Sequence, residues 1–251
     1  MAARSNAEWQ KWGDTDPLFG VASWDGRGAG EANAWTDDEF YAMGESDWND
    51  FLGQWTSFGV TPGECVEIGS GAARLTRPMA SYFAHVHGVD VSDGMISRAR
   101  EATNGLPVTF HLSDGLTIPL PTASVDAAFS THVFQHLDTA ADAEANWREI
   151  ARVLRPGGTF LVHVPVHQWP GGLESLQAVY DVRRKVGDVR AELRRRRMEK
   201  AGGPPIMRGQ SYAWSALEPF LERCGFTNLE LRFVRVSINK GQHSIVLGRR
   251  G

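Results

Sequence analysis

Between Glu64 and Val164, segments typical of buried strands alternate with segments typical of helices, and this alternation limits the chain to a small set of folds. An Arg-Pro-Gly-Gly sequence ends a helix over 140–154. Ser92 is placed to cap the amino end of an earlier helix, over 92–102. Strands that alternate with helices indicate a parallel sheet with crossover helices on its faces. The strands are expected at 64–70, 86–90, 107–112, 125–131 and 159–165, and the helices at 73–84, 92–102 and 140–154.

The segments on either side of this alternation have a different character. A helix is expected over 215–226, followed by two closing strands at 229–238 and 243–250, which completes a doubly wound, seven-stranded α/β sheet with an antiparallel last strand. Residues 168–210 form a polar, basic insertion after the fifth strand. Residues 1–60 hold most of the nine tryptophans and are expected to form a helical lid or cap. The main domain is therefore expected to span 61–251.

Composition excludes several classes of protein. A net charge of −4 argues against general nucleic-acid binding, which requires a basic face. The two cysteines, Cys65 and Cys224, show neither metal-ligand spacing nor a disulfide framework. The first residues lack the apolar core of a signal peptide, and no apolar run is long enough to span a membrane. These features predict a cytoplasmic protein without a membrane partner.

A glycine-rich turn follows the first strand in the sequence CVEIGSGAARLTRPMA, residues 65–80. Gly69 and Gly71 let a ligand approach the backbone, and the chain after them offers N–H groups to an anion. Asp90, at the end of the second strand, is placed to accept hydrogen bonds from ribose hydroxyls. These three residues suit a dinucleotide and an adenosylmethionine equally well.

Arg74 and Glu67 favour the second ligand. Arg74 stands where a dinucleotide fingerprint has glycine or alanine, and its guanidinium suits a single carboxylate. Glu67 would repel a pyrophosphate but attract an ammonium group. A carboxylate and an ammonium together form the tail of an amino acid, so the turn is expected to bind an adenosine joined to an amino acid.

Four segments in order resemble the successive motifs of the class I S-adenosylmethionine-dependent methyltransferases, of the bacterial small-molecule, type 11 kind. They are VEIGSGAARLTRPMA, VHGVDVSDGMISRARE, LSDGLTIPLPTASVDAAFSTHVFQHL and REIARVLRPGGTFLVHV. The resemblance extends from about Cys65 to Val164. It implies a Rossmann-like fold and S-adenosyl-L-methionine as cofactor.

The resemblance also implies roles for the matching residues. Asp90 would hold the ribose, and Asp114 would accept a hydrogen bond from the adenine amino group, although it could instead cap a local turn. Thr131 and His132 would lie near the sulfonium through backbone contacts. The expected cofactor-binding residues are Glu67, Gly69, Ser70, Gly71, Arg74, Asp90, Val91, Met95, Asp114, Gly115, Thr131 and His132.

Histidines follow the fourth and fifth strands, where a general base could stand. His136 is the first candidate base and His167 the second, whereas His163 is expected to pack within its strand. His132 and His136, like His163 and His167, are four residues apart, and Asp138 is close by. A divalent metal is therefore possible but is not predicted.

The expected function is methyl transfer to a small-molecule acceptor, most simply to a hydroxyl of a sugar or glycoside. N- or C-methylation of a natural product, a non-catalytic cofactor-binding protein and a nicotinamide dehydrogenase are the alternatives, and Arg74 and Glu67 disfavour the last. A homodimer is possible.

Overall fold

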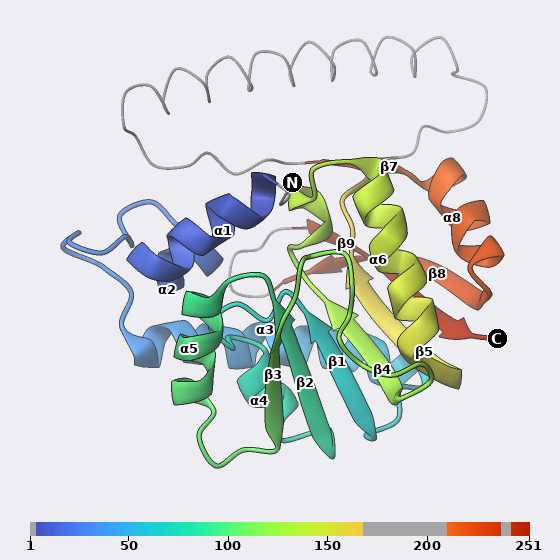
Figure 1. Cartoon of the computed structure of the whole chain (residues 1–251), viewed down its shortest axis with the longest axis horizontal. Coiled ribbons are helices and arrows are strands. Elements are labelled where there is room, and N and C mark those ends of the chain that lie inside the picture. The colour runs from blue at the N-terminus through green and yellow to red at the C-terminus, as the bar shows by residue number, and fades with distance from the viewer. Residues whose placement is uncertain (1–3, 168–209, 237–241) are drawn as a thin grey trace, which may run out of the picture.

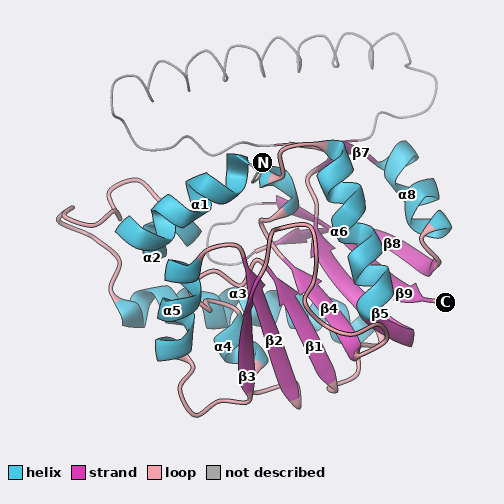
Figure 2. Ribbon diagram, in the orientation of Figure 1, coloured by secondary structure: helices cyan, strands magenta, loops and turns pink. Residues whose placement is uncertain are grey.

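Seven strands form one twisted sheet in the order β3-β2-β1-β4-β5-β9-β8 (Figures 1 and 2). The computed structural model describes residues 4–167, 210–236 and 242–251. Neighbouring strands from β3 to β5 are parallel, and β9 is antiparallel to both β5 and β8. The sheet is therefore the doubly wound, Rossmann-like arrangement that the sequence predicted. Its strands are β1 (Glu64–Ile68), β2 (His85–Asp90), β3 (Val108–Leu112), β4 (Val125–Ser130), β5 (Leu154–His163), β8 (Phe226–Arg235) and β9 (Gln242–Arg250).

Helices cover both faces of the sheet (Figure 2). On one face, Trp147 of α6 and Leu221 of α8 share a buried cluster with Val66 and Phe160. On the other face, aromatic residues of α3 pack with Met79 of α4 and with strand residues such as Leu161. The helices are α1 (Arg4–Thr15), α2 (Pro17–Val21), α3 (Asp37–Phe58), α4 (Thr76–Met79), α5 (Asp93–Ala102), α6 (Ala140–Val153) and α8 (Trp214–Arg223), with a short 3-10 helix at Phe134–His136.

The aromatic N-terminal region divides into two parts. α3 begins at a capping box formed by Thr36 and Glu39 and ends at Gly59, whose φ of 98° only glycine adopts readily. Its Trp55 is fully buried and donates a hydrogen bond from Nε1 to Thr159 Oγ1 at 3.1 Å. α3 is thus part of the core, whereas α1 and α2 lie over the carboxyl ends of the strands (Figure 1).

α1 is held tightly at that edge. The Gln10 amide donates to the Val91 carbonyl at 2.6 Å. Gly13 meets Gly94 at the start of α5 so closely that a Cβ on Gly94 would lie 2.7 Å from the Gly13 carbonyl carbon. Both crossing positions therefore require glycine.

Several sequence expectations differ from the structure, among them the helix expected over 215–226, since α8 ends at Arg223 and β8 begins at Phe226. The helix expected over 73–84 is wrong, because only Thr76–Met79 is α-helical. Ala73 has a φ of 63° within a run of turns, which a helix cannot contain. β5 also begins earlier than expected, at Leu154.

The basic insertion expected over 168–210 lies outside the described residues, apart from Gln210. The chain on its two sides comes together in a short parallel pair, β6 (Val166–His167) with β7 (Tyr212–Ala213). No helix in the described part of the chain has the length and apolar character needed to cross a membrane.

Candidate active site

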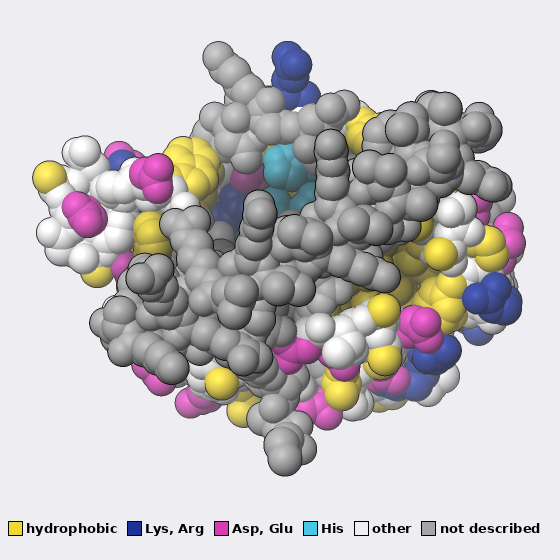
Figure 3. All heavy atoms as spheres, turned by 90° about the horizontal axis from the view of Figure 1, so that it is seen from above, with side chains coloured by type: hydrophobic (Ala, Val, Ile, Leu, Met, Phe, Trp, Pro, Cys, Tyr) yellow, Lys and Arg dark blue, Asp and Glu magenta, His cyan; other side chains and the backbone are white. Residues whose placement is uncertain are grey.

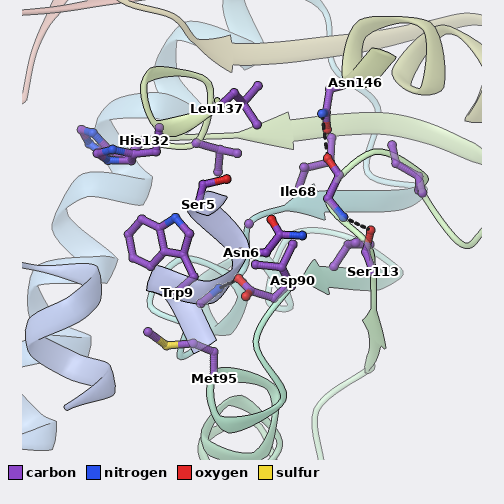
Figure 4. Close-up of a pocket in the computed structure, with 18 of the residues that line it drawn as sticks. Ser5, Asn6, Trp9, Ile68, Asp90, Met95, Ser113, His132, Leu137 and Asn146 are labelled. Carbon is purple, nitrogen blue, oxygen red and sulfur yellow. Dashed lines mark hydrogen bonds between the residues drawn. The ribbon is translucent and has the colours of Figure 1, made fainter. Parts of the chain in front are cut away.

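A cavity lies at the carboxyl ends of β1, β2 and β4, beneath α1 (Figure 4). Doubly wound sheets bind ligands at this edge, where the strand order reverses between β1 and β4. Ser5, Asn6 and Trp9 of α1 close one side of it, and Asp90 and Met95 lie opposite His132 and Leu137 in the close-up.

Most of the predicted site residues line this cavity. They come from the glycine turn, the end of β2, the start of α5, the loop after β3 and the segment after β4. The predicted residues that line it are Gly69, Gly71, Asp90, Val91, Met95, Gly115, Thr131, His132 and His136. Glu67, Ser70, Arg74 and Asp114 are not among its lining, and the side chain of His167 lies outside the described part of the structure.

Asp90 is the buried anionic group of the cavity. One carboxylate oxygen accepts the Gly71 amide at 2.8 Å, and the other accepts the Ser92 amide at 2.9 Å. Burial raises the pKa of this carboxyl, while the amides of Ser92 and Gly71 lower it. Each oxygen retains a lone pair, so the group can still accept hydrogen bonds from two ligand hydroxyls.

The glycine turn brings the backbone up to the cavity without side chains. Gly69 and Gly71 have φ values of 74° and 51°, in the region that favours glycine. A Cβ on Gly69 would lie 2.1 Å from Val133 Cγ2, so no larger residue fits there. Ser70, between them, is buried, and its hydroxyl has no hydrogen-bond partner among the described residues.

Glu67 lies fully within the fold, behind the turn. It accepts a short hydrogen bond from the Thr76 hydroxyl. Burial raises the pKa of Glu67 to about 8, although Thr76 and the nearby Arg74 act in the opposite direction. The carboxyl is therefore mostly protonated near neutral pH, and a ligand ammonium group would favour its ionised form.

Arg74 is buried in an ion pair with Asp47 of α3. This partner was not foreseen from the sequence, since Asp47 lies 27 residues before Arg74. The predicted contact between Arg74 and a ligand carboxylate stays a prediction.

Asp114 is engaged in a local turn. Its Oδ1 accepts the amides of Leu116 and Thr117 at 2.9 and 2.8 Å, which is the capping alternative anticipated for this residue. Its own carbonyl accepts the Asn6 side-chain amide at 2.7 Å. The neighbouring Gly115 faces the cavity, and its carbonyl accepts Asn146 Nδ2 at 2.9 Å (Figure 4).

The two candidate bases differ in what the structure records. His136 lines the cavity, its ring centroid lies 5.4 Å from that of Trp9, and its Nε2 is 2.9 Å from the Gln135 amide nitrogen. His167 lies in β6, and its side chain is outside the described part of the structure.

A group of three histidines lies beside the cavity. His132, His163 and His243 offer ring nitrogens that all lie within 4.8 Å of one another, and they are the group among the described residues that could hold a metal ion. His136 and Asp138, which the sequence spacing associated with a metal, are not part of it.

Sequence reasoning missed several residues of the site. Ser5, Asn6, Trp9 and Asn146 line the cavity, and His243 completes the histidine group. The concentration of tryptophans before residue 60 was the available signal for α1, but it did not distinguish Trp9 from the core tryptophans of α3.

The central part of the chain matches a known family. The model of a methyltransferase domain matches residues 66–162. This range begins in β1 and ends in β5, and it contains the glycine turn, Asp90 and His132.

Curated relatives show the same restricted match. An uncharacterized 37.1 kDa protein in transposon Tn4556 of Streptomyces fradiae is 38% identical over 109 residues, which are 41% of this chain and 31% of that protein. Malonyl-[acyl-carrier protein] O-methyltransferase of Hahella chejuensis is 32% identical over 102 residues, 40% of this chain and 36% of that protein. The chain thus spans about a third of the length of these relatives.

The fold resembles that of solved structures over a greater length. Magnesium protoporphyrin IX methyltransferase from Synechocystis PCC 6803 with bound S-adenosylmethionine has a TM-score of 0.62 at 16% identity. The similarity covers 100% of this chain and 99% of that one.

Proposed function

We propose that the chain transfers a methyl group from S-adenosylmethionine to a hydroxyl of a small-molecule acceptor, because residues 66–162 match the model of a methyltransferase domain. S-adenosylmethionine supplies an already activated methyl group, so the protein has mainly to align the acceptor and remove a proton.

The observation that carries the proposal is the environment of Asp90. Its carboxylate is buried at the end of β2, is fixed by two backbone amides and faces a cavity lined by Gly69, Gly71 and Met95. A ribose diol would satisfy both oxygens. The apolar side chains of Val91, Met95 and Ile118 suit the faces of an adenine ring, and the backbone of Gly115 lies at the same end of the cavity.

The amino-acid end of the cofactor would lie toward the glycine turn. The backbone amides there, with Glu67 and Arg74 behind them, would receive its carboxylate and ammonium groups. The observation in favour is that Glu67 and Arg74 are both buried next to the turn, close enough for Arg74 to lower the pKa of Glu67.

The acceptor would occupy the end of the cavity formed by Thr131, His132, His136 and Leu137, beneath Trp9. In the proposed reaction, His136 takes the hydroxyl proton as the acceptor oxygen bonds to the methyl carbon and the carbon–sulfur bond breaks. The apolar indole of Trp9 is suited to pack on a flat or sugar-like ring. The histidine at this position favours an acceptor oxygen over an acceptor that needs no base.

Calorimetric titration with S-adenosylhomocysteine tests the cofactor part. The wild type should bind it, and Asp90→Ala should weaken binding by about 1.5–3 kcal/mol, the scale of hydrogen bonds to a charged group. Asp93→Ala is the matched control, because that carboxylate is exposed on the first turn of α5. Thermal stabilisation by NAD, with none by S-adenosylhomocysteine, would point to a dehydrogenase.

Incubation of acceptor libraries with S-adenosylmethionine carrying a labelled methyl group tests the transfer. Mass spectrometry of the product locates the methyl group. Label on nitrogen or carbon would replace the hydroxyl assignment by N- or C-methylation, and cofactor binding without transfer to any acceptor would favour a non-catalytic protein.

A further inference from the structure

Three histidines from separate segments converge at the carboxyl edge of the sheet. His132 follows β4, His163 ends β5 and His243 lies near the start of the antiparallel β9. The ring centroids of His132 and His163 are 4.5 Å apart, and that of His243 is 5.2 and 5.1 Å from the other two. Figure 3 shows histidine side chains in a hollow of the surface seen from above, with acidic and basic side chains beside them.

The spacing of the nitrogens suits a metal ion better than a hydrogen-bonded chain. His163 Nε2 and His243 Nδ1 are 3.4 Å apart, which is long for a hydrogen bond. Two nitrogens bound to a tetrahedral ion at about 2.05 Å are separated by about 3.3 Å. All three rings place a nitrogen within 4.8 Å of the others, so small side-chain rotations would complete a three-nitrogen site.

The backbone of His132 supports a specific role for its ring. Its φ of 58° lies in the left-handed region, which is uncommon for residues other than glycine, although asparagine, aspartate and histidine adopt it more often than most. Such strain is concentrated at binding and catalytic positions, where the surrounding structure maintains it.

An unpartnered atom supports the same role for His243. Its Nε2 is buried and has no hydrogen-bond partner among the described residues, and Asp47 Oδ1 is in the same condition. Asp47 is close enough to act electrostatically on the His243 ring. Metal-bound histidines commonly direct their second nitrogen to a carboxylate, and this pair supplies both groups.

The charges around the rings tolerate a cation. A metal ion binds the neutral form of an imidazole ring. Arg74 would repel a cation, but its charge is balanced by the ion pair with Asp47.

Binding has one identifiable cost. His163 Nδ1 accepts the His132 amide at 3.3 Å, so a metal on Nε2 requires the ring proton to move to Nδ1 and that contact to be lost. Because the contact is long and therefore weak, its loss is small beside a metal–nitrogen bond.

We propose that His132, His163 and His243 bind one divalent ion of the kind that prefers imidazole ligands, with zinc as the reference ion. Three protein ligands leave one position open, as in catalytic zinc sites. Since His132 also lines the cavity, that position would lie at the acceptor end and would receive an oxygen of the acceptor. This last consequence rests on the proposed function, whereas binding of the ion does not.

Metal titration of the tag-free, chelator-treated protein without cofactor tests the site. Zinc should bind with one high-affinity ion per chain in calorimetry. Cobalt(II) in the same site should give the intense visible absorption of a tetrahedral complex. His132→Asn, whose side chain tolerates the left-handed backbone, and His243→Gln should each weaken zinc binding by about 100-fold or more.

His87→Ala is the matched control. His87 is a half-buried histidine near the amino ends of the strands, and its two nitrogens already contact His111 and Glu64. It should leave the tight site unchanged. Circular dichroism checks that the two ligand variants are folded, and cobalt absorption in each reports on the site directly.

Absence of saturable zinc binding in the wild type, or equal affinity in wild type and both folded ligand variants, would overturn the proposal. Because neither outcome involves S-adenosylhomocysteine, failure here would leave the proposed methyl transfer untouched.

Discussion

The guanidinium of Arg74 and the carboxylate of Asp47 form an ion pair that ties the glycine turn to α3, with the two side chains 8% and 9% exposed. Removing either partner leaves an unpaired buried charge. We expect Arg74→Met and Asp47→Leu each to lower the free energy of unfolding by about 3–5 kcal/mol, and the double variant to lose much less than their sum. Urea unfolding of the four proteins measures this coupling, and strictly additive losses would contradict it.

Arg74 is also predicted to bind a ligand carboxylate, and this role can be measured separately from its effect on stability. Arg74→Met should weaken S-adenosylhomocysteine binding and leave adenosine binding almost unchanged, because only the first ligand carries a carboxylate. Arg77→Met, an exposed arginine on the next turn, is the control. Equal losses for the two ligands would assign Arg74 a purely structural role.

Glu67 should make the protein less stable as pH rises. Its folded-state pKa of about 8 lies above the unfolded value of 4.5, so the folded chain binds the extra proton between these limits. The contribution is therefore fully present below pH 4.5 and is lost as pH rises through 8, by an amount on the order of a few kcal/mol. Glu67→Gln keeps an oxygen that accepts the Thr76 hydroxyl but cannot titrate, so the stability of this variant should depend less on pH. From pH 5 to 8.5, its melting temperature should rise relative to that of the wild type. Parallel curves for the two proteins would place the carboxyl in a charged state throughout.

Cofactor binding should release a proton from Glu67. An ammonium group near the carboxyl favours the ionised form, so S-adenosylhomocysteine should bind at pH 7 with net proton release. Calorimetry in buffers of different ionisation enthalpy measures the released protons. Glu67→Gln should release fewer protons than the wild type on binding. An identical number in both proteins would mean that Glu67 does not interact with the ligand.

His136 is expected to act as the base. His136→Ala and His136→Gln should both lower turnover by about 10²–10⁴-fold while the affinity for S-adenosylhomocysteine stays within a few-fold. Glutamine can preserve a polar contact near Gln135 but cannot take the proton. Normal turnover in the glutamine variant alone would mean that His136 acts through packing, with His167 the next residue to test.

Trp9 should matter through its position over the cavity. Its ring contacts His136 edge-on, and α1 holds it there through Gln10. Trp9→Ala should raise the apparent KM for the acceptor at least several-fold, since the indole closes that end. Trp24→Ala, which removes an exposed tryptophan packed on Trp35, should leave it unchanged. Equal effects of the two substitutions would argue against an acceptor contact.

Local sequence patterns predicted the strands of the sheet, because these elements are determined by residues that are close together in the chain. The apolar strands, the cap at Ser92 and the glycines at 69 and 71 each follow from residues close by. The strand order then followed from the family resemblance. The prediction of a helix over 73–84 was wrong because the turn gives Ala73 a positive φ, which the residue type does not reveal.

The parts that could not be predicted depend on distant partners. The guanidinium of Arg74 is suited to a ligand carboxylate, yet in the structure it forms an ion pair with Asp47 of α3. The spacing of four residues suggested that His132 pairs with His136, whereas the structure places His132 beside His163 and His243. That grouping depends on the register of β9 against β5, which aligns His163 with Ile245 and which no local pattern encodes.

The position of β9 also has a consequence for the order of assembly. The last strand in sequence lies between β5 and β8, so β8 joins the sheet only through β9. During synthesis on the ribosome, β1 to β5 can therefore pair before the C-terminal strand emerges, while β8 must wait for it. The pairing of β9 with β5 joins segments that lie far apart in the sequence, and such non-local pairing is slow. The histidine group, which includes a residue of β9, would be among the last contacts to form.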